Sequence, residues 1–282
     1  MIYFLHGVVC RNVKTAINSG GKHISVNAFD RLLRYSGNRA CYTFDDGFQS
    51  IYRHAYPKLL NSRIPFTLFL TSDFILGKKI WTDELAILSQ DASFVNRAVA
   101  WAKSHDQAHL KEYRSYATLR VHAKSHERTA LCSMITYLNE QIDITQLPAP
   151  SELFAPLSTD QIQEMLESSL LTLGGHTTSH PILSSLSYDE QYQEIKDNKD
   201  WIEDTFRVNI VDFAYPNGKP TDFNRDTVDV LRQIGYKNAY TTVPSYDEDR
   251  GRPWQIPRIG INADLANWQL WLIAKKLYPV RA

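Results

Sequence analysis

The chain has 282 residues, with 31 basic and 31 acidic side chains and therefore a formal net charge of zero. This balance gives no overall basic field of the kind that nucleic-acid-binding proteins carry, so we expect no nucleic-acid partner. Hydrophobic residues make up 43% of the chain, which excludes wholesale disorder, and the length allows one large domain or two small ones. Three widely spaced cysteines predict neither a disulfide framework nor a paired-cysteine metal motif.

Short apolar runs alternate with helical patterns over much of the chain. Helices are predicted at about 49–61, 188–205 and 226–234, and the second follows Ser187 with Glu190 in a capping-box pattern. Strands are predicted at 2–5, 40–44, 65–71, 170–173, 211–216, 238–243 and 256–261. Repeated strand–helix units imply parallel strands with right-handed crossovers. We therefore expect an α/β fold in which residues 1–282 form one distorted (β/α) barrel.

The section from about 76 to 156 breaks this alternation, because it has few strand signals and reads as helical. We interpret it as a helical insertion that caps one mouth of the barrel. His105, His109, His122 and His126 form two pairs at helical spacing here. Such pairs could bind a metal, but no carboxylate or cysteine stands in a recognisable register around them, so a solvated helical face is favoured.

Neither end of the chain predicts a membrane-spanning or secretion segment. Residues 1–10 are apolar but have no basic flank, and no stretch reaches the 18 or so apolar residues of a spanning helix. We therefore expect a cytoplasmic protein. The amphipathic stretch 268–278 either docks on the core with Lys275 and Lys276 in water, which is favoured, or lies peripherally on the inner face of a membrane.

Two adjacent carboxylates, Asp45 and Asp46, follow a predicted strand in the segment Thr43–Gly47. Side chains alternate along a strand, so both can face one site only where the strand ends or bends. Gly47 supplies the backbone freedom for such a bend. The alternative is an ordinary Asp-Gly turn.

A second polar segment, His176-Thr-Thr-Ser-His180, also follows a predicted strand. If it forms a helical turn, both imidazoles project from one face and can bind one ion. This spacing is frequent by chance among nine histidines. Its position strengthens it, because the carboxyl ends of barrel strands are where barrel active sites lie.

A third segment, Tyr215-Pro-Asn217-Gly218, ends another predicted strand. It reads as a turn and nothing more, or as a turn that aims a backbone N–H at a developing oxyanion. Tyr215 and Asn217 are therefore candidate substrate or oxyanion residues.

The order of these motifs resembles the polysaccharide deacetylases of carbohydrate esterase family 4. Thr43–Gly47 matches that family's first motif verbatim, and His176–His180 matches its second. The resemblance covers about 1–75 and 157–265, everything except the insertion. It implies that Asp45 is the general base. It also implies that Asp46, His176 and His180 bind one divalent metal ion, usually Zn²⁺, with an open position for water.

The sequence departs from the family pattern in two places. Ala214 stands where the third motif often has the arginine that orients the base, and Arg258 is our candidate replacement, with an ordinary structural arginine as the alternative. The family's later catalytic histidine is missing, because no histidine follows His180. His6, at the end of the first strand, is the candidate general acid or pocket residue; otherwise it is structural, and Asp45 itself protonates the leaving group.

These motifs predict a metal-dependent hydrolase that removes an N-acetyl or other short N-acyl group from an amino sugar. The expected partner is a carbohydrate: a nucleotide-linked, lipid-linked or oligosaccharide amino sugar in a glycan or glycan precursor. One alternative is a hydrolase of another C–N bond, such as an N-formyl sugar or a cyclic amide. The other is a catalytically silent sugar-binding protein, against which the complete set of Asp45, Asp46, His176 and His180 speaks.

Overall fold

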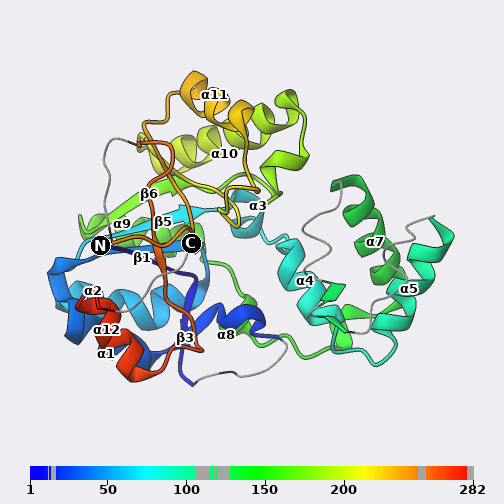
Figure 1. Cartoon of the computed structure of the whole chain (residues 1–282), viewed down its shortest axis with the longest axis horizontal. Coiled ribbons are helices and arrows are strands. Elements are labelled where there is room, and N and C mark those ends of the chain that lie inside the picture. The colour runs from blue at the N-terminus through cyan, green and yellow to red at the C-terminus, as the bar shows by residue number, and fades with distance from the viewer. Residues whose placement is uncertain are drawn as a thin grey trace.

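A computed structural model describes residues 1–11, 13, 17–105, 115–116, 118–119, 128–246 and 252–277 of the chain. Seven parallel strands form its main sheet, in the order β8-β7-β6-β5-β4-β1-β9 (Figure 1). They are β1 (Ile2–Leu5), β4 (Cys41–Asp46), β5 (Phe66–Leu70), β6 (Leu171–Gly175), β7 (Asp212–Ala214), β8 (Asn238–Tyr240) and β9 (Ile259–Gly260). Two further strands, β2 (Gly7–Val9) and β3 (His23–Ser25), pair separately and were not expected from the sequence.

The seven-stranded sheet curls into a distorted half-barrel. A parallel bridge joins Tyr240 of β8 to Ile256, which lies just before β9. The Ile256 N–H donates to the Ala239 carbonyl, and the Thr241 N–H donates to the Ile256 carbonyl, each at 2.9 Å. This bridge joins the β8 edge to the segment that leads into β9, and the curled sheet confirms the expected distorted (β/α) barrel.

Helices pack around the sheet, and most of them connect consecutive strands. They are α1 (Val26–Ser36), α2 (Tyr56–Asn61), α3 (Ser72–Ile75), α9 (Thr159–Glu167), α10 (Tyr188–Phe206), α11 (Arg225–Ile234) and α12 (Asn267–Ala274). The expected capping box starts α10, since Ser187 accepts from the Glu190 N–H while the Glu190 carboxylate accepts from the Ser187 N–H. The helix expected at 49–61 is present: residues 49–50 are helical, a π-helical turn follows at Ile51–Ala55, and the helix continues as α2.

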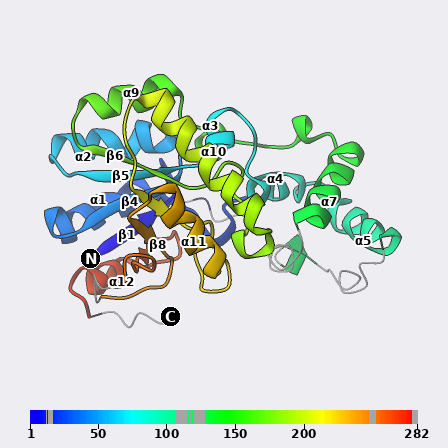
Figure 2. The ribbon, with the colours of Figure 1, turned by 90° about the horizontal axis from the view of Figure 1, so that it is seen from above.

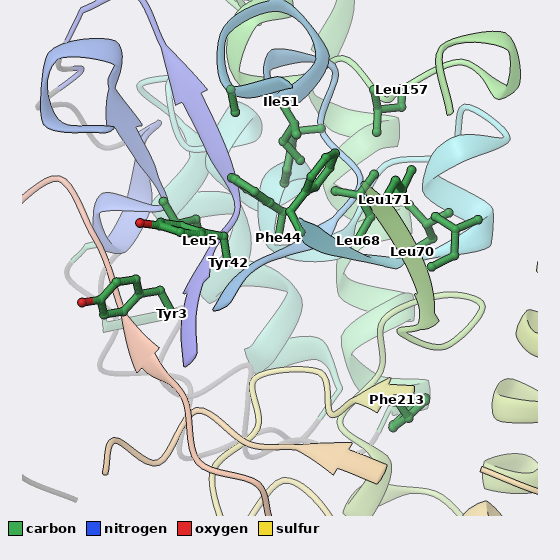
Figure 3. Packing of buried hydrophobic residues seen from close by; sticks show 14 of the residues in the cluster. Tyr3, Leu5, Tyr42, Phe44, Ile51, Leu68, Leu70, Leu157, Leu171 and Phe213 are labelled. Carbon is green, nitrogen blue, oxygen red and sulfur yellow. The ribbon is translucent and has the colours of Figure 1, made fainter. Parts of the chain in front are cut away.

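Buried aliphatic and aromatic side chains from the central strands form the main core. Figure 3 shows Phe44, Leu68 and Leu70 gathered with Ile51 and other apolar residues beside the strands. Because both faces of a parallel sheet are covered, β4 and β5 are almost completely buried along their length. This core holds the strand ends in fixed positions.

The predicted insertion contains helices that share a second hydrophobic core. They are α4 (Trp81–Leu88), α5 (Phe94–Ser104) and α7 (Arg128–Gln141), whereas α8 (Ser151–Phe154), near the end of the predicted insertion, contacts β2. Leu88, Phe94 and Leu138 belong to this second cluster, and α4, α5 and α7 lie to one side of the barrel in Figures 1 and 2. The limits of the insertion, 76–156, and the assignment of 1–282 to one domain stay predictions.

The histidines of the insertion do not form a metal site within the part of the chain that the structure describes. The His105 ring stacks on Trp101, with ring centroids 4.7 Å apart. His109, His122 and His126 lie outside the described residues.

The last helix, α12, docks on the barrel beside α1. Leu270, Ile273 and Ala274 are buried there, while Lys275 and Lys276 are exposed as the docked interpretation expects. Trp268 and Trp271 remain 61% and 43% exposed. None of the described helices is both long and apolar enough to cross a bilayer.

Candidate functional site

The register of three central strands brings the predicted polar segments together. Asp46 at the end of β4 pairs with Leu70 of β5, and Leu70 pairs with Gly175 of β6. His176 follows directly, and its N–H donates to the Leu70 carbonyl at 3.1 Å. The two motifs therefore lie at the same carboxyl edge, around a pocket of about 230 Å³. The pocket is lined by His6, Asp45, Asp46, His176, His180 and Asn217 among others.

Asp45 is buried and held by Arg258. The guanidinium donates from both terminal nitrogens to the two carboxylate oxygens, at 2.7 and 2.9 Å, and also to Thr43 Oγ1 at 3.0 Å. Arg258 is fully buried, with its guanidinium carbon 4.9 Å from the Phe4 ring centre and 5.3 Å from that of Phe69. Burial by itself would raise the pKa of Asp45, but the Arg258 charge outweighs it and holds the pKa below its usual value. Asp45 is thus an oriented, ionised carboxylate.

Asp46 faces both imidazoles of the second motif. Its Oδ1 lies 3.4 Å from His176 Nε2 and 3.5 Å from His180 Nε2. All three side chains are buried, and Asp46 Oδ1 accepts no hydrogen bond from any described residue. A completely buried acceptor that faces two imidazole nitrogens without a hydrogen bond is a natural position for a bound cation.

The segment from His176 to His180 is a loop and not the helical turn that its spacing allowed. Thr177 and His180 take left-handed backbone conformations, with φ of 67° and 60°. The Thr177 hydroxyl accepts from the His180 N–H at 3.1 Å, and the Trp81 indole N–H donates to the His180 carbonyl at 3.0 Å. This loop still brings the two rings to 5.0 Å between centroids. Pro181 follows immediately, which removes the N–H that a continuing helix needs.

Hydrogen bonds behind His176 fix the direction of its ring. Nδ1 donates to the Ala214 carbonyl at 2.7 Å, which leaves Nε2 toward Asp46. The buried Asn198 accepts from the His176 N–H at 3.1 Å and donates to the Leu70 carbonyl at 3.0 Å. Gly175, directly before His176, leaves room for Tyr236, because a Cβ on residue 175 would lie 2.2 Å from the Tyr236 hydroxyl. The residues around His176 therefore fix its ring with Nε2 toward Asp46.

His6 lines the same pocket, as expected from its place after β1. Burial lowers its pKa to about 4, although Asp46 opposes this shift. The His180 pKa falls to about 3, again mainly through burial. Both imidazoles are therefore neutral at pH 7, and a neutral imidazole is the form that can bind a metal.

Of the two candidates from the third motif, Tyr215 and Asn217, only Asn217 is found among the pocket-lining residues. Asn217 lines the pocket with a φ of 58°, and its carbonyl accepts from the Thr242 hydroxyl at 2.6 Å. The structure does not bring Tyr215 to the pocket. Its ring stacks on Phe223 in the core, its hydroxyl donates to the Trp254 carbonyl, and its N–H donates to the Tyr240 carbonyl. The expectation for Tyr215 as a substrate or oxyanion residue is therefore corrected.

Two pocket residues were missed by the sequence reading. Lys22 Nζ lies 2.8 Å from Asp46 Oδ2 and 3.1 Å from Asp83 Oδ1, and its charge sits 4.4 Å from the centre of the Phe48 ring. Burial opposes the charged form of Lys22, but Asp46 and Asp83 outweigh it, so its pKa is raised. Asp83 belongs to α4, so the insertion reaches the site. Nothing in the sequence distinguishes Lys22 from the other lysines.

The three-residue set fits a divalent metal ion. One carboxylate and two imidazoles are the donors that zinc takes in catalytic sites, and about 3.3 Å separates neighbouring N and O ligands of a tetrahedral zinc. The separations of 3.4 and 3.5 Å around Asp46 Oδ1 agree with this value. Lys22 pairs with the other Asp46 oxygen, Oδ2, so Oδ1 is the oxygen that faces the two imidazoles.

Comparison with known proteins decides the family. The sequence model described as "Polysaccharide deacetylase" matches residues 34–239, most of the chain. The chain belongs to the polysaccharide deacetylase family. The match contains Asp45, Asp46, His176 and His180, and it also spans residues 76–156, the predicted insertion.

The chain has low sequence identity to the three relatives described below. It is 27% identical over 88 residues to "Putative polysaccharide deacetylase YxkH" of Bacillus subtilis (strain 168), a stretch of 31% of this chain and 30% of that protein. The Streptococcus pyogenes deacetylase PplD in complex with acetate has a TM-score of 0.60 at 18% identity, over 99% of this chain and 97% of that one. IcaB from Ammonifex degensii has a TM-score of 0.59 at 17% identity, over 99% of this chain and 97% of the IcaB chain. At these identities the solved structures establish the shared fold.

Proposed function

We propose that this protein is a metal-dependent N-deacetylase that hydrolyses the N-acetyl or other short N-acyl group of an amino sugar. One observation carries the proposal: the oriented Asp45 carboxylate stands beside the three converging donors of Asp46, His176 and His180 in a single pocket. Membership of the polysaccharide deacetylase family supports the same reaction class.

Asp46, His176 and His180 would hold the metal ion. When bound there, a divalent ion, which we propose to be Zn²⁺, supplies Lewis-acid polarisation and lowers the pKa of water. The protein holds each of these side chains through a separate contact. Lys22 pairs with Asp46, Ala214 accepts from His176, and Thr177 and Trp81 fix the backbone of His180.

Asp45 would act as the general base. Its lowered pKa keeps it ionised at neutral pH, so it can take the proton of a water molecule that attacks the amide carbonyl. Arg258 is a positioning residue, because its two hydrogen bonds fix the carboxylate plane without reaching the pocket itself. A backbone N–H at Asn217 is the proposed additional donor to the oxyanion that forms on the carbonyl oxygen.

The leaving amine needs a proton, and His6 is our proposed donor. Because His6 is neutral at pH 7, it would first take the proton that Asp45 removes from water and then pass it to the amine nitrogen as the C–N bond breaks; both residues line the pocket. The alternative donor is Asp45 itself after it has gained that proton. The two assignments predict different rates when the leaving group is changed from an amine to one that needs no proton.

The proposed substrate is a nucleotide-linked, lipid-linked or oligosaccharide amino sugar. The pocket lining includes Lys22, Asp83 and Asn217, which together offer hydrogen-bond donors and hydrogen-bond acceptors. Such a lining suits a sugar ring, whose hydroxyl groups both donate and accept hydrogen bonds. A lipid-linked substrate would agree with peripheral contact through α12, whose Trp268 and Trp271 are exposed. The cytoplasmic location and this membrane contact stay predictions.

Acyl release from a panel of N-acetyl and N-formyl amino sugars tests the proposal. We expect acetate release by the wild-type protein and a loss of about 10² to 10⁴ in rate for Asp45→Asn, with the metal content unchanged. Asp160→Asn, at an exposed position, is the matched control. Formate release in place of acetate would change the acyl group, and a metal-loaded protein that releases neither would support the silent sugar-binding alternative.

A further inference from the structure

A second group of metal-binding side chains lies outside the pocket. Cys10 follows β2, His54 lies in the π-helical turn Ile51–Ala55, and Glu152 lies in α8. Their ligand atoms all lie within 4.8 Å of one another. We propose that Cys10, His54 and Glu152 form a second metal site, which takes Zn²⁺ and ties the end of the insertion to the barrel.

The distances fit a tetrahedral zinc. Cys10 Sγ lies 3.7 Å from His54 Nε2, and Glu152 Oε1 lies 3.2 Å from the same nitrogen. Zinc bond lengths of 2.3 Å to sulfur and 2.0–2.1 Å to nitrogen or oxygen place neighbouring ligands at about 3.6 Å and about 3.3 Å in a tetrahedron. One thiolate, one imidazole and one carboxylate are all accepted zinc ligands, and the exposed side of Cys10 leaves a fourth position for water.

The same geometry argues against a Cys–His–Glu nucleophile. In such a relay the imidazole contacts the nucleophile through one nitrogen and the carboxylate through the other. Here Cys10 and Glu152 both approach Nε2 of His54. Three donors that converge on one point suit a cation better than a proton relay.

The backbone around the three ligands holds them in place. The Cys10 N–H donates to the Glu152 carboxylate, which brings the ends of β2 and α8 together. The Gln49 N–H donates to the Ala155 carbonyl at 2.8 Å, and Phe48 forms an antiparallel bridge with Pro156. His54 projects from a π-helical turn, an irregularity that is frequent at functional sites. The elements that carry the ligands are therefore already paired through their backbones.

This site shares no residue with Asp46, His176 and His180, and only it contains sulfur. Cobalt(II) can therefore distinguish the two sites, because only a thiolate ligand gives a near-ultraviolet sulfur-to-cobalt charge-transfer band. The purified chain is stripped with chelator, titrated with Co²⁺ and followed by absorbance. We expect the band in the wild-type protein and in His176→Ala, which removes a ligand of the pocket site.

Cys10→Ser should abolish the band, while Cys132→Ser, at another exposed cysteine, should leave it unchanged. Glu152→Gln keeps the thiol and the side-chain size, and it should weaken Co²⁺ affinity at this site more than about tenfold, since even partners of a ligand contribute that much. Zinc analysis should give two equivalents in the wild-type protein and one in either Cys10→Ser or His176→Ala. A wild-type protein without the band, or a band that survives Cys10→Ser, would overturn the second site while leaving the deacetylase proposal intact.

Discussion

Arg258 and Asp45 are 213 positions apart in the sequence, and their side chains form two buried hydrogen bonds of 2.7 and 2.9 Å. Arg258→Leu would leave the Asp45 charge buried without a partner, which costs about 3–5 kcal/mol of unfolding free energy. Arg258→Lys keeps the charge but cannot form the bidentate pair, so we expect a smaller loss of stability together with a clear fall in kcat. Chemical denaturation and kinetic measurements check both. A Lys variant with wild-type kcat would contradict the positioning role.

Lys22, which is partly exposed, pairs with the buried Asp46, and the contribution of this pair to the unfolding free energy should depend on bound metal. Lys22→Met removes the cation next to Asp46, so the metal-free protein should lose about 3–5 kcal/mol. Zn²⁺ supplies the missing charge, so the difference in melting temperature between zinc-loaded and chelator-treated protein should be larger in Lys22→Met than in the wild type. Lys58→Met breaks only a surface pair with Asp30 and is the control, with an expected change of 0–1 kcal/mol. An equal loss with and without zinc would count against this account.

Removal of metal should abolish acyl release and lower stability together. A ligand that binds only the folded state contributes about 2.7 kcal/mol when its free concentration is one hundred times Kd. Chelation should therefore lower the melting temperature, and Zn²⁺ should restore both properties. In His180→Ala, added Zn²⁺ should not restore acyl release, although the Cys10 site can still stabilise the fold. Full activity after complete removal of metal would contradict metal dependence.

His6 can be separated from Asp45 by the choice of leaving group. If His6 protonates the leaving amine, His6→Gln should lower amide hydrolysis by about 10² to 10⁴. An activated acetate ester leaves without protonation, so its hydrolysis should change less than about tenfold. Metal content and melting temperature serve as controls for folding. Equal losses on both substrates would show that His6 does not act as the proton donor.

The close approach of Gly175 and Tyr236, next to His176, can be tested by a substitution at Gly175 and a second one at Tyr236 that relieves it. In Gly175→Ala the new Cβ would lie 2.2 Å from the Tyr236 hydroxyl, an overpacking that costs about 1–3 kcal/mol. Tyr236→Phe removes that oxygen, which has no hydrogen-bond partner among the described residues. The double variant should therefore recover part of the lost unfolding free energy and zinc affinity. Strictly additive effects in the double-mutant cycle would exclude this contact as the cause.

The sequence predicted the features that depend on local patterns. Buried strands at β4, β5 and β6 follow from their apolar runs, and parallel pairing then places Asp46 and His176 at one edge. Tyr215 shows where motif reasoning was incomplete. Side chains alternate along a strand, so Tyr215 shares the core face of Phe213, whose ring lies 5.6 Å away. The alternation could have placed Tyr215 in the core.

Other features depend on contacts between distant parts of the chain. Lys22 meets Asp83 only because a loop before β3 and the first helix of the insertion converge on the same pocket. No periodicity or spacing encodes such a meeting. The sequence allowed a helical turn from His176 to His180, because an i, i+4 spacing is compatible with both a helical turn and the observed loop. Cys10, His54 and Glu152 likewise form a group only after folding.

Four residues around the pocket have left-handed backbone conformations, and this limits how the thermal stability of the protein can be raised. Asp46, Thr177, His180 and Asn217 have φ values of 73°, 67°, 60° and 58°, where glycine is the least strained residue. Selection for heat resistance alone would favour glycine at these positions. Each such exchange would remove a side chain that the proposed chemistry uses or that holds one in place. A thermostable variant of this protein should therefore be sought by screening for stability and for the proposed acyl release together.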